Sequence, residues 1–294
     1  MKDKKASIVQ PLVSIVILTY NHEKYIAQAI EGVLAQKVSF DYEIILSNDC
    51  STDGTDAVCR KYAETNLSIR YFNHELNMGL IANHCWSVKQ AKGKYIAYCD
   101  GDDYWIDEYK LQRQMDYMEA HPECSLCYHN VILEFGNNRS LFLPVAKRSG
   151  AIELAEIVGR WAIPTSAVVY RRELIIGKED EVINYPNEDY AVEIYMRSKG
   201  EYYYDATSIG AVYRRHAASV TAGMNANEIK MYEDIIRLLA DAKIWFPNDE
   251  DILFDSAIKS YQERVARIER NIKNPFLKYL KKNTYKKWLL SILN

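Results

Sequence analysis

Residues 13–34 read VSIVILTYNHEKYIAQAIEGVL, and this stretch predicts a buried strand followed by a helix. The strand is expected because the apolar run Val13–Leu18 is broken only by one serine, a pattern typical of a parallel strand covered on both faces. The helix is expected because apolar side chains recur at helical spacing from Tyr25 onward, with Asn21 available as its N-cap. A strand leading into an amphipathic helix is the first half of a βαβ unit.

The same alternation continues through the first hundred residues. Further strands are expected at 43–46, 69–72 and 95–99, and further helices at 56–63 and 80–91. Right-handed βαβ crossovers build a parallel sheet, and such a sheet binds its ligand at the carboxyl ends of the strands.

Beyond residue 105 the pattern changes. Strand-like and helix-like stretches are now mixed, and they lie at 111–118, 125–135, 141–143, 165–170, 190–199, 201–204 and 208–214. From Asn225 to the end the periodicity is helical. The sequence therefore predicts an α/β domain over residues 1–222, with halves at 11–105 and 106–222, and a C-terminal helical region at 223–294.

Composition excludes several classes of protein. The chain has 294 residues and is 48% hydrophobic, so it can bury a sizeable core and is not disordered throughout. A formal net charge of -3 gives no general attraction to nucleic acid. The polar stretch 1–10 and the short apolar run after it do not resemble a signal peptide or a membrane span, and we expect a cytoplasmic location.

The first informative acid is Asp49, which follows a predicted strand in the motif Asn48-Asp-Cys-Ser-Thr-Asp53-Gly. A carboxylate at this edge can accept a hydrogen bond from the imide N–H of a base such as uracil. The alternative is a turn or N-cap role, which suits Asp53 better than Asp49.

The second acidic motif is Asp100-Gly101-Asp102-Asp103, directly after a predicted strand. Carboxylates this close repel one another, so they need a cation or exposure to solvent. Oxygen ligands favour Mg²⁺ or Mn²⁺, which proteins usually hold together with substrate phosphates. A solvated turn is the alternative, but the place of the motif after a buried strand favours a metal site.

Two further motifs lie in the second half. Glu188-Asp189 opens a predicted helix, where an acid is stabilised as the anion and is available to accept a proton. His216 follows a predicted strand and is a candidate metal ligand. Taken alone, each motif favours a structural role, as a helix cap for Glu188-Asp189 and as a structural or exposed histidine for His216.

Trp161, Thr165 and Ser166 precede or begin a predicted strand and are candidate ligand contacts, because an aromatic face can pack against a ring. A tryptophan packed in the core is the alternative for Trp161.

Taken together, the ordered motifs resemble the family 2 glycosyltransferases of the GT-A fold, over roughly residues 11–220. The motifs that carry the resemblance are Thr19-Tyr-Asn21, Asn48-Asp49 through Gly54-Thr55, Asn77-Met-Gly79 through Asn83, Gly93-Lys-Tyr-Ile96, Asp100 to Asp103, Glu188-Asp189 and His216. One departure is Asn48, where many members carry a second acid. The resemblance implies a GT-A type, Rossmann-like mixed sheet flanked by helices, with residues 11–105 as the nucleotide-binding half and 106–222 as the acceptor half.

The resemblance also implies roles for individual residues. The donor nucleotide sugar would contact Thr19, Tyr20, Asn21, Asp49, Asn83, Asp100 and Asp102. The metal, Mn²⁺ or Mg²⁺, would be held by Asp102, with Asp103 as the alternative in a shifted register, and by His216. Asp189 would be the general base, paired with Glu188. The acceptor pocket would be lined by Trp161, Thr165 and Ser166, since an aromatic face suits a sugar ring.

The implied activity is metal-dependent, inverting transfer of a sugar from a nucleoside diphosphate, with UDP as the expected carrier. The acceptor would be a hydroxyl of a growing glycan or a lipid-linked saccharide in surface polysaccharide synthesis. Two other classes are a non-catalytic sugar-nucleotide or glycan-binding protein on the same fold and a nucleotidyltransferase. Neither a G-x-G-x-x-G turn nor a Walker loop follows the first strand, which disfavours other dinucleotide enzymes.

The C-terminal stretch 275–293 has the pattern of a basic amphipathic helix. The chain carries six lysines and no acid from Lys273 onward. Such a helix either packs on the catalytic domain or lies on an anionic membrane, which would place the protein at the inner face of the cell membrane. A homodimer is left open.

Overall fold

The computed structural model describes residues 10–142, 148–161, 163–216, 219 and 227–273. The chain divides into two compact units, residues 1–219 and residues 220–294. The predicted boundary between 222 and 223 and the predicted helix at 275–293 both fall outside the described residues.

The first unit contains a ten-stranded mixed sheet in the order β3-β2-β1-β4-β9-β6-β10-β5, with β7 paired to β6 and β8 to β10. The strands are β1 Val13–Thr19, β2 Tyr42–Asn48, β3 Ile69–Asn73, β4 Tyr95–Tyr98, β5 Tyr104–Trp105, β6 Cys124–Phe135, β7 Asn138–Leu141, β8 Gly150–Ala151, β9 Val169–Arg171 and β10 Glu201–Arg215. Strands β1 to β4 are parallel, as the βαβ pattern predicted.

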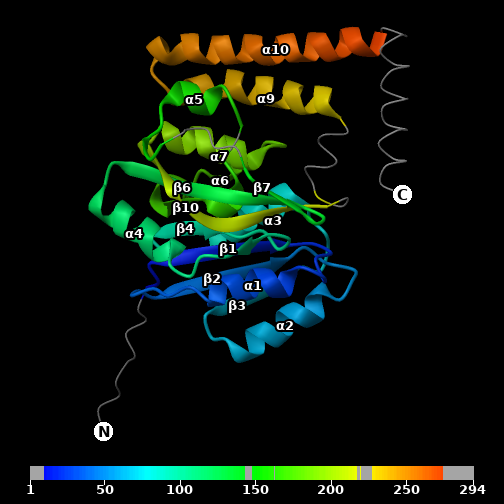
Figure 1. Cartoon of the computed structure of the whole chain (residues 1–294), viewed down its shortest axis with the longest axis vertical. Coiled ribbons are helices and arrows are strands. Elements are labelled where there is room, and N and C mark those ends of the chain that lie inside the picture. Colours follow the sequence, from blue (N-terminus) through cyan, green and yellow to red (C-terminus); the bar gives the residue numbers. More distant parts are fainter. Residues whose placement is uncertain (1–9, 143–147, 162, 217–218, 220–226, 274–294) are drawn as a thin grey trace. The chain divides into compact units, whose positions relative to one another are not determined.

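The helices of this unit are α1 Ile26–Leu34, α2 Thr55–Thr65, α3 Leu80–Gln90, α4 Lys110–Ala120, α5 Leu154–Val158, α6 Glu179–Val182 and α7 Glu188–Arg197. Helices α1 and α2 lie beside the blue strands β1 to β3 (Figure 1). The chain returns from β3 to β4 in the opposite direction along the sheet, so a right-handed crossover puts α3 on the other face.

The core is centred on β1, in which every residue is buried. Its apolar side chains Val13, Ile15, Val16 and Ile17 have no exposed surface, and each contributes roughly 1.5–3 kcal/mol relative to an exposed position. This rigid strand fixes the loop that follows Thr19, where the predicted site begins.

Four details differ from the sequence-based expectation. Asn21 does not cap the first helix, because its backbone is left-handed (φ 56°) and α1 begins only at Ile26. The predicted strand 165–170 begins instead with a 3₁₀ turn at Thr165–Ala167, and the strand itself is β9. The hairpin after β6 is tighter than predicted, since β7 already begins at Asn138.

The fourth difference is that the strands predicted at 201–204 and 208–214 form one strand, β10. It pairs with β6 along its whole length, with a register shift between Asp205 and Ile209 that accommodates the intervening residues. The polar interruption therefore marks a bulge rather than the end of a strand.

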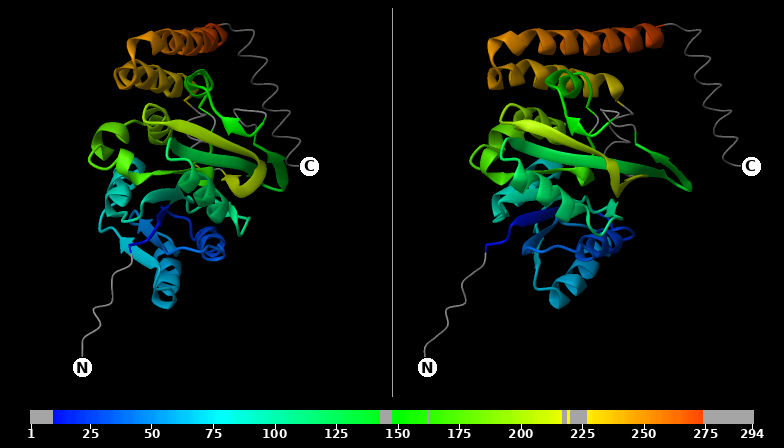
Figure 2. Two further views of the ribbon diagram at one scale, coloured as in Figure 1. Left: turned by 90° about the vertical axis from the view of Figure 1, so that its left-hand side faces the viewer. Right: turned by 60° about the vertical axis from the view of Figure 1, so that its left-hand side comes forward.

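Among its described residues the second unit contains two α-helices, α9 Glu228–Ala242 and α10 Asp251–Lys273, which lie side by side (Figure 2). Asn227 caps α9 by accepting a hydrogen bond from the backbone N–H of Lys230. The predicted C-terminal helical region is present over these described residues. Across the described part of the chain, no helix combines the length and the apolar character needed to cross a membrane.

Candidate active site

The loops after β1 and β2 lie against each other. Asn21 Oδ1 accepts a hydrogen bond from the backbone N–H of Thr52 at 2.8 Å, and the Asp49 N–H donates to Thr19 O at 2.9 Å. Thr19 is buried, whereas Tyr20 is 44% exposed. The first three predicted donor residues are therefore brought together with Asp49, and the aromatic ring of Tyr20 is accessible.

Asp49 holds the turn before α3. Its two carboxylate oxygens accept the backbone N–H groups of Met78 at 2.8 Å and Gly79 at 2.9 Å. Each oxygen keeps a second lone pair for a further donor. Asn83, by contrast, is buried against the sheet, where its Oδ1 accepts from the Ser47 hydroxyl at 2.6 Å and lies 3.1 Å from His74 Nε2.

The Asp100–Asp103 turn follows β4 and is held against the end of β1. The Gly101 N–H donates to Leu18 O at 2.8 Å. A Cβ at this glycine would lie 2.8 Å from Thr19 Oγ1 and 2.9 Å from Leu18 O, so any side chain would displace the turn. Glycine is required here by the close approach of the two loops.

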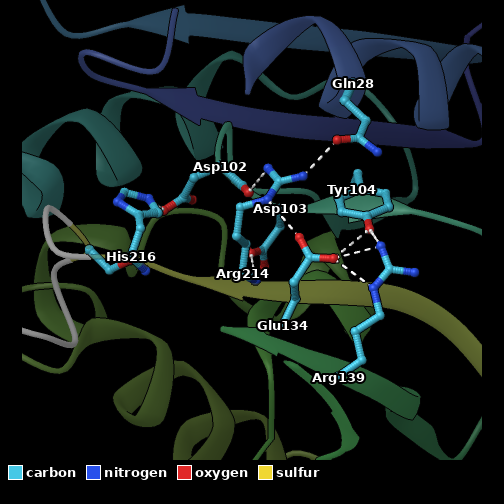
Figure 3. A network of polar contacts seen from close by, with 9 residues as sticks. Gln28, Asp102, Asp103, Tyr104, Glu134, Arg139, Arg214 and His216 are labelled. Carbon is cyan, nitrogen blue, oxygen red and sulfur yellow. Dashed lines mark hydrogen bonds and ion pairs between the residues drawn. The ribbon is translucent and has the colours of Figure 1, made fainter. Parts of the chain in front are cut away.

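The acids of this turn point in different directions (Figure 3). Asp102 Oδ2 lies 3.1 Å from His216 Nε2 and 3.9 Å from His22 Nε2. Asp103 is 2% exposed, and its Oδ1 accepts the backbone N–H of Arg214 at 2.9 Å. The structure thus brings Asp102 and His216 together, while Asp103 contacts the backbone of β10.

Electrostatics separate the acids further. Burial alone would raise the pKa of Asp102, but the hydrogen bond from His216 and the charge of His22 hold it below its usual value. Burial raises the pKa of Asp100 well above normal, and the carboxylates of Asp102, Glu188 and Asp189 raise it further. Burial, with Asp102 and Asp100, raises the pKa of Asp103 in the same way. Asp102 is therefore the acid of the turn that favours the charged form.

Glu188 and Asp189 begin α7, and Asp189 contacts two of the residues predicted for the acceptor pocket. Asp189 Oδ2 accepts from Trp161 Nε1 at 3.3 Å and from Thr165 Oγ1 at 3.4 Å. Burial, and next the charge of Glu188, raise the pKa of Asp189 to about 7. Ser166, the third residue predicted for the acceptor pocket, is buried. Its backbone carbonyl accepts hydrogen bonds from Trp105 Nε1 and Lys110 Nζ, both at 3.1 Å.

Three residues at the site were not expected from the sequence. His22 and Arg214 both face the Asp100–Asp103 turn. His84 lies on α3 with Nδ1 3.7 Å from Glu188 Oε1 and Nε2 2.7 Å from the Tyr98 hydroxyl. Proximity in the chain was the available clue for Arg214, two residues before His216, and for His22, directly after the Thr19-Tyr-Asn21 motif. His84 likewise directly follows Asn83, the last residue of the Asn77–Asn83 motif.

The site fits a divalent cation only in part. In residues 10–273, apart from the gaps given above, no three His, Cys, Asp or Glu side chains are grouped so that they alone could hold an ion. The carboxylate of Asp102 facing the imidazole of His216 supplies two ligands of a type that Mn²⁺ accepts. The remaining positions would have to come from the phosphates of a ligand and from water, as is common for Mg²⁺ and Mn²⁺ sites.

Comparison with known proteins shows the family and the fold of this chain. The model of the family described as "Glycosyl transferase family 2" matches residues 14–145. An uncharacterized protein of Mycobacterium tuberculosis, Rv1520, is 34% identical over 75% of this chain, and the chain spans 63% of that relative's length. WfaP of Escherichia coli, a UDP-Glc:alpha-D-GlcNAc-diphosphoundecaprenol beta-1,3-glucosyltransferase, is 30% identical over 72% of this chain and 80% of its own length.

Two solved structures are similar in fold. Staphylococcus aureus TarS in complex with UDP aligns with a TM-score of 0.64 and 20% identity, over 86% of this chain and 71% of that one. The mannosyltransferase PcManGT of Pyrobaculum calidifontis, in complex with GDP-Man and Mn²⁺, aligns with a TM-score of 0.60 and 14% identity, over 96% and 81%. At these identities the likeness concerns the fold alone, and it confirms the predicted mixed α/β sheet of GT-A type flanked by helices.

Proposed function

The chain belongs to glycosyl transferase family 2, and on that premise we propose that it moves a sugar from a nucleoside diphosphate to an acceptor hydroxyl with inversion at the anomeric carbon. The observation that carries this proposal is the position of Asp189. Its half-buried carboxylate, with a pKa raised to about 7, contacts Trp161 and Thr165 and interacts electrostatically with the Asp100–Asp103 turn.

The donor nucleotide would bind along the loops after β1, β2 and β4. Thr19, Tyr20 and Asn21 would line the nucleoside with Asp49, whose free lone pairs suit the imide N–H of uracil. Asn83, which is buried, would support these nucleoside-binding residues indirectly through its contacts with Ser47 and His74. Asp100 and Asp102 would face the ribose and diphosphate.

Asp102 and His216 would hold the divalent cation, Mn²⁺ or Mg²⁺, with Asp103 fixing the turn through the backbone of β10. When bound, the cation neutralises the departing diphosphate and acts as a Lewis acid.

Asp189 would accept the proton of the acceptor hydroxyl as that oxygen attacks the sugar. A group with a pKa of about 7 is suited to this role, because it is partly ionised at neutral pH and still basic enough to take the proton. Glu188 contributes by keeping that pKa high. Trp161, Thr165 and Ser166 would form the acceptor wall, in which Trp161 and Thr165 also orient the carboxylate.

For the acceptor, we propose a growing glycan or a lipid-linked saccharide in surface polysaccharide synthesis. Support comes from WfaP, whose name describes a UDP-Glc donor and a diphosphoundecaprenol-linked acceptor. A lipid-linked acceptor would draw the protein to the inner face of the cell membrane, with residues 275–293 as the proposed contact. UDP is the proposed carrier because TarS was solved with UDP and because Asp49 suits uracil.

The test is Asp189→Asn, assayed for sugar transfer and for binding of UDP-sugars with Mn²⁺ by thermal shift. We expect transfer to fall by about 10²–10⁴-fold while donor binding is retained, since only the base is removed. Asp180→Asn, which changes a carboxylate on α6 paired with Lys89, is the matched control. Full transfer activity in Asp189→Asn would show that the base is elsewhere, and a wild type that binds donor without any turnover would favour a non-catalytic sugar-nucleotide-binding protein.

A further inference from the structure

Arg214, near the end of β10, makes two hydrogen bonds to the Asp100–Asp103 turn (Figure 3). Its backbone N–H donates to Asp103 Oδ1 at 2.9 Å, and its Nη1 donates to the carbonyl of Asp102 at 2.5 Å. One residue therefore holds the side chain of one acid and the backbone of the other.

The remaining guanidinium nitrogens are held by other elements. Nε pairs with Glu134 Oε1 on β6 at 3.2 Å, and Nη2 donates to Gln28 Oε1 on α1 at 2.6 Å. The rings of Tyr25 and Tyr104 each have their centroid 4.7 Å from the guanidinium carbon. Arg214 is only 9% exposed, so the side chain is fixed in one orientation from four elements.

This arrangement is specific to arginine. A planar guanidinium can donate at the same time to a carbonyl, a carboxylate and an amide oxygen while its faces pack on aromatic rings. A lysine would keep the charge but would offer a single nitrogen. The contacts of Arg214 therefore depend on the planar shape of the guanidinium as well as on its charge.

Arg214 is also two residues from His216, at the end of the same strand. It donates to the carbonyl of Asp102, whose Oδ2 lies 3.1 Å from His216 Nε2. We propose that Arg214 is a positioning residue that presets Asp102 and His216 for the divalent cation and the donor diphosphate. This inference rests on the proposed function, in which those two side chains are the metal ligands.

The experiment measures Mn²⁺ binding by EPR in the presence of saturating UDP, and unfolding temperature in parallel. Arg214→Met is expected to raise the Kd for Mn²⁺ by about 10–100-fold, the usual effect of losing a residue that orients a ligand. The matched control is Arg139→Met. Arg139 also pairs with Glu134 and donates to the Tyr104 hydroxyl at 2.8 Å, but no contact joins it to the acidic turn among the described residues.

The control separates positioning from stability. Both substitutions remove an ion pair with Glu134 and both are expected to lower the unfolding temperature, but only Arg214→Met should weaken Mn²⁺ binding. If Arg214→Met does not fold, Arg214→Lys and Gln28→Met replace it, because Lys keeps the charge and Gln28 is exposed. Each should weaken Mn²⁺ binding in part, and an unchanged Kd in a folded Arg214 variant overturns the inference.

Asp102→Asn distinguishes this failure from failure of the proposed function. Loss of Mn²⁺ binding in Asp102→Asn but not in the Arg214 variants would remove the positioning role alone. If Asp102→Asn binds Mn²⁺ as wild type does, or if wild type binds none, the proposed metal site and the positioning role both fall.

Discussion

At the scale of single residues, the site contains acids whose surroundings drive their pKa values apart. His216 and His22 favour the ionised form of Asp102, whereas burial, followed by the charge of Glu188, favours the neutral form of Asp189. Carboxylates of one site with opposite pKa shifts are typical of active sites in which one acid binds charge and the other transfers a proton. The two roles proposed for these residues follow from that difference.

Glu188→Gln should shift the pH dependence of transfer. As the proposed base, Asp189 must be ionised to accept a proton, so kcat/KM is expected to rise with pH through about 7 in wild type. Removing the charge of Glu188 takes away the second cause of the raised pKa, so the rising limb should move to lower pH. Profiles of wild type, Glu188→Gln and the control Asp180→Asn check this. If the rising limb of the Glu188→Gln profile stays in place or moves to higher pH, the charge of Glu188 does not raise the pKa of Asp189.

Asp189→Asn should also change stability in a pH-dependent way. The pKa of Asp189 is about 7 in the folded protein against an ordinary value of 3.8, so its stabilising effect is complete below pH 3.8 and is lost as the pH rises through 7. Above that, an ionised buried carboxylate opposes folding.

The variant cannot ionise at this position. It should therefore gain stability over wild type on the order of a few kcal/mol in the free energy of unfolding at about pH 8, and less at about pH 5. Urea titrations at both pH values measure it. A larger gain at the lower pH would contradict the assignment.

The site could be predicted from the sequence where the chemistry is carried by local motifs. The Asp100–Asp103 turn, Glu188-Asp189 and His216 each follow a predicted strand or open a predicted helix, and the sheet brings their loops to one edge. The direction of each acid could not be predicted, because the contact of Asp103 with Arg214 joins positions 111 residues apart. The same holds for His84, whose proximity to Glu188 depends on how α3 and α7 pack.

At the scale of elements, the turn after β4 depends on a residue that carries no side chain. Gly101 lies directly under the loop after β1, with its N–H on Leu18 O. The backbone can come this close only because nothing projects from its Cα. This contact sets the distance between the loop after β1, which is proposed to bind the nucleoside, and the Asp100–Asp103 turn.

Gly101→Ala should therefore impair the metal and donor site. The new Cβ would lie 2.9 Å from the Leu18 carbonyl, a backbone atom that cannot rotate away. We expect Mn²⁺ and UDP affinity to fall by about 10-fold or more, with the fold retained. Calorimetric titration measures it. Gly54→Ala is the control, since the obstructing atoms there belong to the flexible Glu23 side chain, and equal losses in both variants would contradict the argument.

The type and order of the elements could largely be predicted, and the errors have physical causes. The parallel half was predicted with its ends within about two residues, because buried strands and amphipathic helices each leave a strong periodic pattern. The single strand β10 was predicted as two, since residues 206–208 bulge away from β6 and interrupt the alternation. The 3₁₀ turn at Thr165–Ala167 was predicted as strand, because it leads directly into the run Val168-Val169-Tyr170, whose residues favour extended structure.

At the scale of the whole molecule, the lysines from Lys273 onward support the proposed location at an anionic membrane surface. A helix over 275–293 would present Leu277, Leu280 and Trp288 on one face and lysines on another. Each lysine near an anionic bilayer contributes about 1 kcal/mol of binding free energy at low salt.

The full chain is accordingly expected to sediment with anionic vesicles, and a chain ending at Asn274 to sediment less. The difference should shrink as salt is added, since the attraction is electrostatic. Neutral vesicles are the control. Equal sedimentation of the two chains would leave packing on the catalytic domain as the role of this segment.

The pairing of strands in the sheet of the first unit determines whether its two halves can fold or move separately. Strand β9 of the second half pairs with β4 of the first, and β5 of the first half pairs with β10 at the far edge. The halves are interleaved by backbone hydrogen bonds, so neither should be obtainable as a folded fragment and both should melt in one cooperative step. Substrates would thus enter and leave through rearranging loops at the rim, without any hinge between the halves.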